Sequence, residues 1–305
     1  MDGQATAGRR AHYAEFYGGV PGTGPVLLVH GNCQAEAVRV LLEPALPELR
    51  AVRLPPVHEL ARTEVGLLQR LLTRCQVLVT QPVATGYRGL PLGAAEVAAL
   101  VPPSAVVVRV PVVRSSRLHP WQAIVRDPHD PSHPPPVVAY HDLRTLYAAA
   151  LGLPAPVRDR TTAAGIRAVG QASTVELARR EQHTDVQVSD LLASELMWTL
   201  NHPGNGLLRR LAERVLAMLG RPAQVPDPGR DLLGVVRAPL EAEVLAALGH
   251  PGPAREHWLV DGREVDPQRV WQAQLAWYSQ HPQVVVAGLD RHAGTLRLLG
   301  LAAQR

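Results

Sequence analysis

The nine residues VLLVHGNCQ, from Val26 to Gln34, place a cysteine where a nucleophile is readily activated. An apolar run typical of a buried strand stops at Gly31, and Cys33 follows where the next helix must begin. A helix N-terminus offers unpaired backbone N–H groups and the positive end of the helix dipole, which favour a thiolate over a thiol. We therefore expect Cys33 to be catalytic, and burial as an ordinary core cysteine is the alternative.

Amide side chains surround this cysteine in the sequence. Asn32 and Gln34, together with N–H groups at the helix start, are suited to form an oxyanion hole for acyl transfer or to hold a phosphate or carboxylate. The alternative for Asn32 is a simple helix N-cap. Gln81 ends a second apolar run just before a proline. Its amide is expected to project into the same crevice, unless it only satisfies loop carbonyls.

A glycine-rich loop after Gln81 carries Tyr87 and Arg88. An arginine beside an aromatic residue on such a loop suits an anionic ligand. The alternative is a solvated surface arginine. Phosphate binding by Arg88 is thus one expectation for this loop.

A nucleophilic thiol needs a base within hydrogen-bond reach, and four histidines stand at loop or helix-start positions. We prefer His202 because the NHPGN loop that contains it is constrained and leads into a strong helix. His119 and His141 are expected to line the pocket or to be structural, and His58 is the fourth candidate. Asp185 or Asp190 would orient the base, unless either simply begins the following helix.

The spacing of the remaining residues argues against several other chemistries. The chain has no H-E-x-x-H or C-x-x-C pattern, so no metal is expected. It also has no G-x-x-x-x-G-K-[ST] motif and no strand-linked G-x-G-x-x-G motif, so nucleotide hydrolysis and dinucleotide redox chemistry lack support.

Strands and helices alternate in the first half of the chain. This order predicts an α/β fold in which a parallel sheet is flanked by helices and ligands gather at the carboxyl ends of the strands. The second half is mostly helical. The expected strands are 26–30, 51–54, 76–80 and 105–110, and the expected helices are 35–42, 63–72, 94–100, 142–151, 174–182, 186–199 and 207–219. Asn205 is expected to cap the last helix, and Gly220 follows its end.

Glycine and proline positions suggest three segments. Residues 1–24 are expected to be a flexible arm, 25–220 an α/β catalytic core with a helical insertion, and 221–305 a small C-terminal lobe.

Composition narrows the function class further. Hydrophobic residues make up 46% of the 305 residues and charged residues 19%, the balance of a folded globular protein. The net charge of +4 comes from scattered arginines without a dense basic stripe, so we expect no nucleic-acid partner. Two cysteines argue for a reducing, cytoplasmic setting. No apolar stretch predicts secretion or membrane insertion.

An ordered set of short motifs then resembles the WcbI family of polysaccharide-biosynthesis enzymes. The resemblance covers roughly residues 25–220 and implies a coenzyme A-binding O-acetyltransferase acting on a capsular sugar, with likeness to SGNH-type hydrolases and a three-layer core. It gives Cys33 the active-site role, its flanking amides a supporting role and His202 that of the base. The motifs are Gly31-Asn32-Cys33-Gln34, Gln81-Pro82, Tyr87-Arg88, Tyr140-His141, Thr184-Asp185-Val186, Ser189-Asp190 and Asn201-His202-Pro203.

The chain departs from this family around His119, where a Gly-Tyr-His-Pro type of sequence is expected but Arg117-Leu118-His119-Pro120 stands. The C-terminal lobe also matches nothing familiar. An acceptor other than a capsular sugar, such as a specialised metabolite, therefore stays open.

The cysteine turn and the family resemblance together predict a coenzyme A-dependent acyltransferase that acts on a hydroxyl or amine acceptor. The alternatives are an SGNH-like esterase or thioesterase, in which water replaces the acceptor, and a non-catalytic module that binds an acyl group or coenzyme A. The expected catalytic residues are Cys33, His202 and Asp185; the expected cofactor-binding residues are Gly31, Asn32, Gln34, Gln81 and Arg88; the expected substrate-binding residues are Tyr87, His119 and His141.

Overall fold

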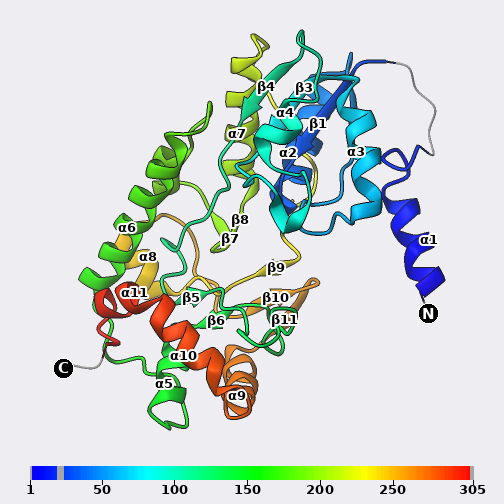
Figure 1. Cartoon of the computed structure of the whole chain (residues 1–305). Helices are drawn as coiled ribbons and strands as arrows, with labels where there is room; N and C mark the ends of the chain where they lie inside the picture. The colour runs from blue at the N-terminus through cyan, green and yellow to red at the C-terminus, as the bar shows by residue number, and fades with distance from the viewer. Residues whose placement is uncertain (1, 19–23, 303–305) are drawn as a thin grey trace. The chain divides into compact units, whose positions relative to one another are not determined.

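The computed structural model describes residues 2–18 and 24–302. Its backbone divides into two compact units, each of which is assembled from several stretches of the chain (Figure 1). Unit 1 comprises Met1–Val112, Ala178–Val188 and Asn205–Leu233, and unit 2 comprises Val113–Leu177, Ser189–Gly204 and Gly234–Arg305.

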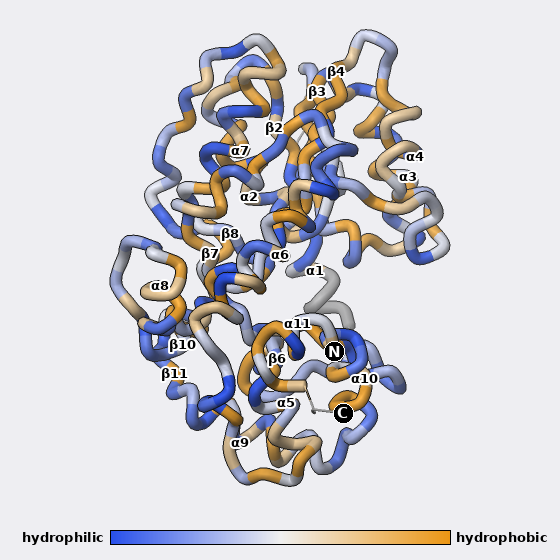
Figure 2. Tube along the Cα trace, turned by 90° about the vertical axis from the view of Figure 1, so that its left-hand side faces the viewer, coloured by the Kyte–Doolittle hydropathy of each residue, from blue (hydrophilic) through white to orange (hydrophobic). Residues whose placement is uncertain are grey.

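Unit 1 is built on a four-stranded parallel sheet in the order β2-β1-β3-β4. All five residues of the first strand are buried, as expected for a continuous apolar run in a parallel sheet. The chain is also strongly hydrophobic along β3 and β4 (Figure 2). All four predicted strands are therefore confirmed, as β1 (Val26–His30), β2 (Arg50–Val52), β3 (Cys75–Thr80) and β4 (Val106–Arg109).

Helices flank this sheet. Leu68 and Leu72 of α3 and Val97 of α4 belong to one apolar cluster with Leu28 of β1 and Leu78 of β3. Helix α2 packs against β1 and α7. The predicted class, a parallel α/β sheet flanked by helices, is confirmed. The helices are α2 (Cys33–Leu42), α3 (Val65–Leu72), α4 (Ala94–Ala98) and α7 (Asn205–Met218), with short 3-10 turns η1 (Glu43–Ala45), η2 (Arg62–Glu64) and η3 (Tyr87–Gly89).

The strand order reverses beside β1. From β1 the chain forms β2 on one side and then returns to form β3 on the other. In open α/β sheets, ligands bind outside the carboxyl ends of the strands at such a reversal. The carboxyl ends of β1 and β3 lead into Gly31 and Gln81. The fold therefore places the motifs that begin with these two residues at the reversal of the strand order.

The N-terminal segment differs from the flexible arm that the sequence predicted. Residues Asp2–His12 form α1, and Tyr13 and Phe16 are buried in the same apolar cluster as β1. The glycines that suggested an arm all follow this helix, and the two aromatic residues anchor the segment to the core. Residues 19–23 of the predicted arm lie outside the described residues.

Unit 2 is largely helical with small antiparallel sheets, as the predicted helical second half suggested. Its sheets pair β5 with β6, β7 with β8, and β10 with both β9 and β11. The helices are α5 (Leu143–Ala150), α6 (Ala163–Glu181, which ends in unit 1), α8 (Ala242–Leu248), α9 (Pro267–Tyr278), α10 (Pro282–Arg291) and α11 (Ala293–Leu298); the strands are β5 (Gln122–Ala123), β6 (His141–Asp142), β7 (Met197–Thr199), β8 (His202–Pro203), β9 (Val236–Arg237), β10 (Trp258–Val260) and β11 (Arg263–Val265).

The predicted helix over residues 186–199 is wrong. The segment forms a 3-10 turn, η4 (Ser189–Ala193), and then strand β7, which pairs with β8. The buried Met197 and Thr199 gain backbone partners from the strand that contains His202. This pairing outweighs the helical spacing of apolar residues that motivated the prediction.

Helix α7 ends as predicted but begins differently. Gly220 adopts a positive φ of 67°, and the N–H of Arg221 donates to Leu216 O over 2.9 Å, which is a glycine-dependent C-terminal cap. Asn205 is the first helical residue, and its side chain bonds Arg230 O and the N–H of Leu232. These bonds tie the segment after α7 to unit 1, so the units do not divide at the predicted residue 221.

None of the helices in the described part of the chain combines the length and apolar character needed to cross a bilayer.

Candidate functional site

Cys33 is the first residue of α2, directly after the turn that closes β1. Asn32 is the N-cap of this helix: its backbone is extended and its Oδ1 accepts a 2.9 Å hydrogen bond from the N–H of Gln34. The capping alternative for Asn32 is thus confirmed. Its amide NH₂ is turned to no partner among the described residues, so the cap leaves this group able to donate.

The Gln81 side chain holds this turn by hydrogen bonds. Its Oε1 accepts the N–H of Asn32 over 2.9 Å, and its Nε2 donates to Gln34 Oε1 over 3.3 Å and to Pro111 O over 3.4 Å. Both glutamines are only 2% exposed. Gln81 therefore positions the turn through both ends of its amide, and its contact with a ligand stays a prediction.

The protonation state of Cys33 differs from the sequence-based expectation. Burial raises the pKa of the Cys33 thiol, the N–H groups of Cys33 and Gln34 at the helix start lower it by less than burial raises it, and the negative charge of Glu59 adds a smaller rise. The helix terminus alone therefore does not make a thiolate here. Cys75, the second cysteine, is buried in β3 and has a pKa raised by burial to about 12, so Cys33 is the more accessible of the two free thiols.

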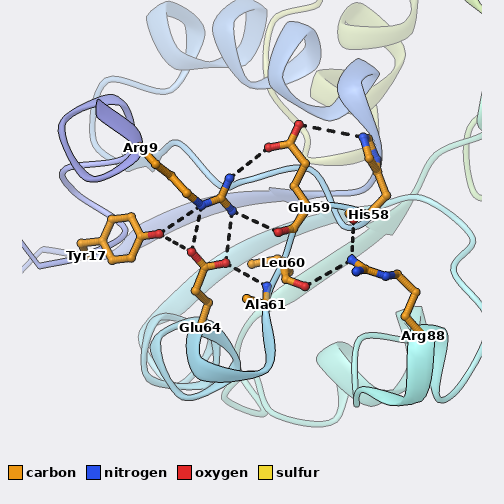
Figure 3. Close-up of polar contacts among 8 residues, drawn as sticks. All are labelled: Arg9, Tyr17, His58, Glu59, Leu60, Ala61, Glu64 and Arg88. Atoms are coloured by element: carbon orange, nitrogen blue, oxygen red, sulfur yellow. Dashed lines mark hydrogen bonds and ion pairs between the residues drawn. The ribbon is translucent and has the colours of Figure 1, made fainter. Parts of the chain in front are cut away.

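The segment His58–Leu60 lies beside the Cys33 turn, because the N–H of Val57 donates to Gly31 O over 2.8 Å. An ion-pair network holds this segment (Figure 3). Arg9 of α1 donates to Glu59 Oε2 over 3.1 Å and to Glu64 Oε1 over 3.0 Å. Burial would raise the pKa of Glu64, but the bonds from Arg9 and from the N–H of Ala61 lower it overall. Helix α1 thus holds in place the segment His58–Leu60, which lies beside the turn before Cys33.

Arg88 reinforces the same segment from the other side. It adopts a positive φ of 56°, and its guanidinium donates to the carbonyls of His58 and Leu60 (Figure 3). An unusual backbone conformation at an exposed non-glycine residue is often tied to function. Tyr87 is half-buried at the same turn and joins the cluster around Leu90. Part of the Arg88 guanidinium is therefore used to hold the segment His58–Leu60 in place.

His202 lies in unit 2, at the start of β8. Its Nδ1 lies 3.5 Å from the hydroxyl of Tyr140, which donates to Asn201 Oδ1 over 2.9 Å and lies 3.0 Å from Thr199 Oγ1. Burial lowers the pKa of His202. The imidazole is therefore neutral near pH 7, the form that a general base needs.

Asp185 has a partner other than the base. It lies in unit 1, where its carboxylate accepts two bonds from the Arg109 guanidinium, of 3.0 and 3.1 Å, and a 2.7 Å bond from the Arg109 N–H. Burial would raise the pKa of Asp185, but these bonds lower it overall. Within unit 2, Tyr140 contacts the His202 ring, a pairing that the sequence did not predict.

His119 and His141 both line a cavity of about 330 Å³ in unit 2. His119 Nε2 lies 2.9 Å from Met197 O, and burial lowers the pKa of this histidine to about 4. Both ring nitrogens of His141 are occupied, by Tyr278 Oη at 2.6 Å and Val125 O at 3.1 Å, and burial lowers its pKa to about 4 as well. These histidines are neutral structural members of the cavity wall rather than bases.

The cysteine turn and its supports define the class of protein. A half-buried cysteine at a strand-to-helix turn, at the reversal point of a parallel sheet, is the arrangement of α/β enzymes that present a nucleophile there. A family model described as polysaccharide biosynthesis enzyme WcbI matches residues 26–224. The chain belongs to this WcbI family of polysaccharide biosynthesis enzymes.

Comparison with solved structures supports the same fold over most of the chain. The structure is similar to WcbI, described as a novel polysaccharide biosynthesis enzyme, in its native form without a disulfide bond between coenzyme A and one of its cysteines. The TM-score is 0.77 at 21% sequence identity, and the match covers 91% of this chain and 97% of WcbI. No curated protein matches the chain significantly.

Proposed function

We propose that this protein is an acyltransferase that moves an acyl group from coenzyme A to a hydroxyl or amine of a small-molecule acceptor, a sugar or a specialised metabolite. Its membership of the WcbI family supports a role in polysaccharide biosynthesis. The description of the WcbI structure mentions both coenzyme A and a cysteine, which supports a coenzyme A-derived donor.

The observation that carries this proposal is the position of Cys33 as the first residue of α2, beside Asn32, whose Oδ1 caps the helix and whose NH₂ group is left to donate. An acyl thioester develops negative charge on its carbonyl oxygen as it is attacked, and N–H donors at a helix start stabilise such an oxyanion. Cys33 either takes the acyl group itself or lies next to the thioester while the acceptor attacks. In the first route its sulfur forms a new thioester, the carbon–sulfur bond to coenzyme A breaks, and the leaving thiolate takes up the proton.

His202 is assigned as the base in this proposal. Its lowered pKa keeps it neutral, so it is able to accept the proton of the acceptor hydroxyl as the carbon–oxygen bond forms. The carbon–sulfur bond of the thioester breaks in the same step, and the leaving thiolate takes the proton from the imidazolium. Removing a well-placed base costs roughly 10²- to 10⁴-fold in rate. We therefore expect His202→Ala to lose most turnover while coenzyme A binding persists, and full turnover in this variant contradicts the assignment.

Mass spectrometry after incubation with acetyl-coenzyme A tests the route. An acetyl adduct that is present in the wild type and in Cys75→Ser, but absent in Cys33→Ser, supports covalent transfer through Cys33. A stable complex without an adduct supports direct attack by the acceptor. Release of acetate without any acceptor would make the protein a thioesterase, and wild-type biological activity in Cys33→Ala would make it a binding module.

A further inference from the structure

The cavity lined by His119 and His141 has features of a ligand-binding site, independently of the cysteine turn. It belongs wholly to unit 2, and its volume of about 330 Å³ falls within the range of small-molecule pockets, about 300–1,000 Å³. Its wall is formed by residues of the 118–158 segment and of the 238–274 segment. Cys33 and His202 are not part of this wall, but Tyr140, whose hydroxyl lies 3.5 Å from His202 Nδ1, is.

Three buried polar atoms in this wall have no hydrogen-bond partner among the described residues: Gln122 Nε2, Thr145 Oγ1 and Gln274 Oε1. Thr145 and Gln274 are fully buried. A buried polar atom without a partner destabilises the folded state, and native structures hold few of them. Three around one cavity indicate a polar occupant that supplies the missing partners.

The orientation of both amides is set by bonds on their other side. Gln122 Oε1 accepts the N–H of Leu200 over 2.6 Å, so its Nε2 is the donor that remains. Gln274 Nε2 donates to Tyr140 O over 2.7 Å, so its Oε1 is the acceptor that remains. The Thr145 hydroxyl is able to do both. The wall therefore offers a fixed donor, a fixed acceptor and an adaptable group, which is the complement of several adjacent hydroxyls.

Aromatic side chains supply the apolar part of the wall. Trp258 stacks on Tyr140 with ring centroids 6.1 Å apart, and Trp271 also lines the cavity. The face of an aromatic ring carries partial negative charge, which attracts the C–H groups on the flat side of a sugar ring. Hydroxyls at the edge of such a ring would meet the amides.

The charges of the wall balance. Arg144 is bound to both Asp142 and Glu241 over 2.7 Å and lies over the Trp121 ring at 3.9 Å, and Arg158 lies 3.8 Å from Glu241. Arg255 is followed directly by Glu256, and both line the cavity. The cavity thus gathers no excess of positive charge, which disfavours a polyphosphate such as the nucleotide part of coenzyme A.

We infer that this cavity binds the acceptor, and that the acceptor presents an uncharged, hydroxyl-rich pyranose ring between the tryptophans and the two glutamine amides. Calling the ligand of this cavity an acceptor rests on the proposed acyl transfer. The binding site itself stands on the cavity wall.

The test uses the full-length protein and three methyl pyranosides, of the gluco, manno and galacto series, as probes. Saturation-transfer NMR and tryptophan fluorescence measure their binding, glucose 6-phosphate serves as a charged counterpart, and calorimetry measures coenzyme A binding in the same samples. We expect at least one methyl pyranoside to bind and the phosphate to bind more weakly. The absence of pyranoside binding overturns the inference.

Thr145→Val is the sharpest variant because it preserves shape and removes a hydroxyl that is bonded by none of the residues the structure describes. We expect a roughly 3- to 10-fold loss of pyranoside affinity with an unchanged or raised melting temperature. A lowered melting temperature would mean that the protein itself uses the hydroxyl, which contradicts the inference. Trp271→Leu is expected to weaken the same binding, and Trp277→Phe, outside the cavity wall, is the matched control.

Coenzyme A binding separates this inference from the proposed function. Unchanged coenzyme A affinity in Thr145→Val and Trp271→Leu supports an acceptor site. Weakened coenzyme A affinity with unchanged pyranoside binding assigns the cavity to the donor and overturns the inference. Pyranoside binding by a wild type that transfers no acyl group would end the proposed function and leave this binding site standing.

Discussion

Gly31 and Gln81 fit together so closely that no larger residue is accommodated at position 31: a Cβ atom there would lie 2.2 Å from Gln81 Oε1. The same oxygen accepts the N–H of Asn32. The absence of a side chain at Gly31 therefore allows the Gln81 amide to reach beneath the turn that presents Cys33. A substitution at either residue should therefore change the position and the reactivity of the Cys33 thiol.

Gly31→Ala is expected to lower the free energy of unfolding by about 1–3 kcal/mol, because the added methyl group displaces a buried amide. Urea unfolding measures this loss. Gly66→Ala, in α3 with only Arg70 Nη1 within 4 Å of the added atom, is the matched control and should stabilise by about 0.5–1 kcal/mol. Equal effects of the two substitutions would contradict the clash.

The reactivity of Cys33 should rise with pH as the thiol deprotonates, and Glu59 should contribute to where this rise falls. Because burial and the negative charge of Glu59 both raise the pKa of the thiol, native protein should react slowly with iodoacetamide at neutral pH and faster as pH rises. Glu59→Gln removes the charge and should move the midpoint of this profile to lower pH. Native protein should be alkylated once and unfolded protein twice, since Cys75 is buried.

The exposed Glu48, which pairs with Arg221, provides the control for this profile. Glu48→Gln should leave the alkylation midpoint unchanged. Identical midpoints in Glu59→Gln and the wild type would show that Glu59 does not act on the thiol.

Short-range patterns predicted the parts of the site that are local in sequence. The apolar run of β1, Gly31 and the helix start at Cys33 are contiguous, so periodicity and capping rules suffice to place them. The bonds that tune the site join distant residues: Asn32 to Gln81 across 49 positions and Arg9 to Glu64 across 55. No local pattern encodes such pairs. For that reason the sequence does not predict that Arg9 of α1 binds Glu59 and Glu64.

The unpredicted partner of His202 has a related cause. Tyr140 stood in the motif set, but its closeness to Thr199 and Asn201 depends on the β7–β8 pairing. The sequence pattern favoured a helix over residues 186–199, so this pairing was not foreseen. Helical spacing in a short apolar stretch does not distinguish a helix from a strand with a nearby partner.

Asp185→Asn distinguishes an ion-pair role from a catalytic one. Since the Arg109 side chain is 61% exposed, loss of the pair should cost no more than about 1 kcal/mol of stability. The lowered pKa of Asp185 means that the wild-type advantage is present above the unfolded pKa and is lost as pH falls through the folded pKa. Urea unfolding at pH 7 and at acidic pH measures both effects. A loss of turnover without a loss of stability would instead place Asp185 in the catalytic machinery.

Tyr140→Phe tests how His202 is held. The substitution keeps the ring that contacts the His202 imidazole and removes the hydroxyl that lies 3.5 Å from Nδ1. We expect kcat to fall by about tenfold with little change in coenzyme A affinity, because the base loses a group that orients it. Tyr147→Phe, whose hydroxyl accepts a bond from Arg160 elsewhere in unit 2, is the control and should keep full activity.

The pH profile of the acyl transfer is a separate test of His202. Burial lowers the pKa of this imidazole, so the neutral form persists to lower pH than for an exposed histidine. The acidic limb of kcat/KM should therefore lie below the ordinary histidine value of about 6.5. Its midpoint should move in Tyr140→Phe, which changes the surroundings of the ring, and should stay in Tyr147→Phe. An acidic limb above the ordinary value, or one unaffected by His202→Ala, would mean that another group takes the proton.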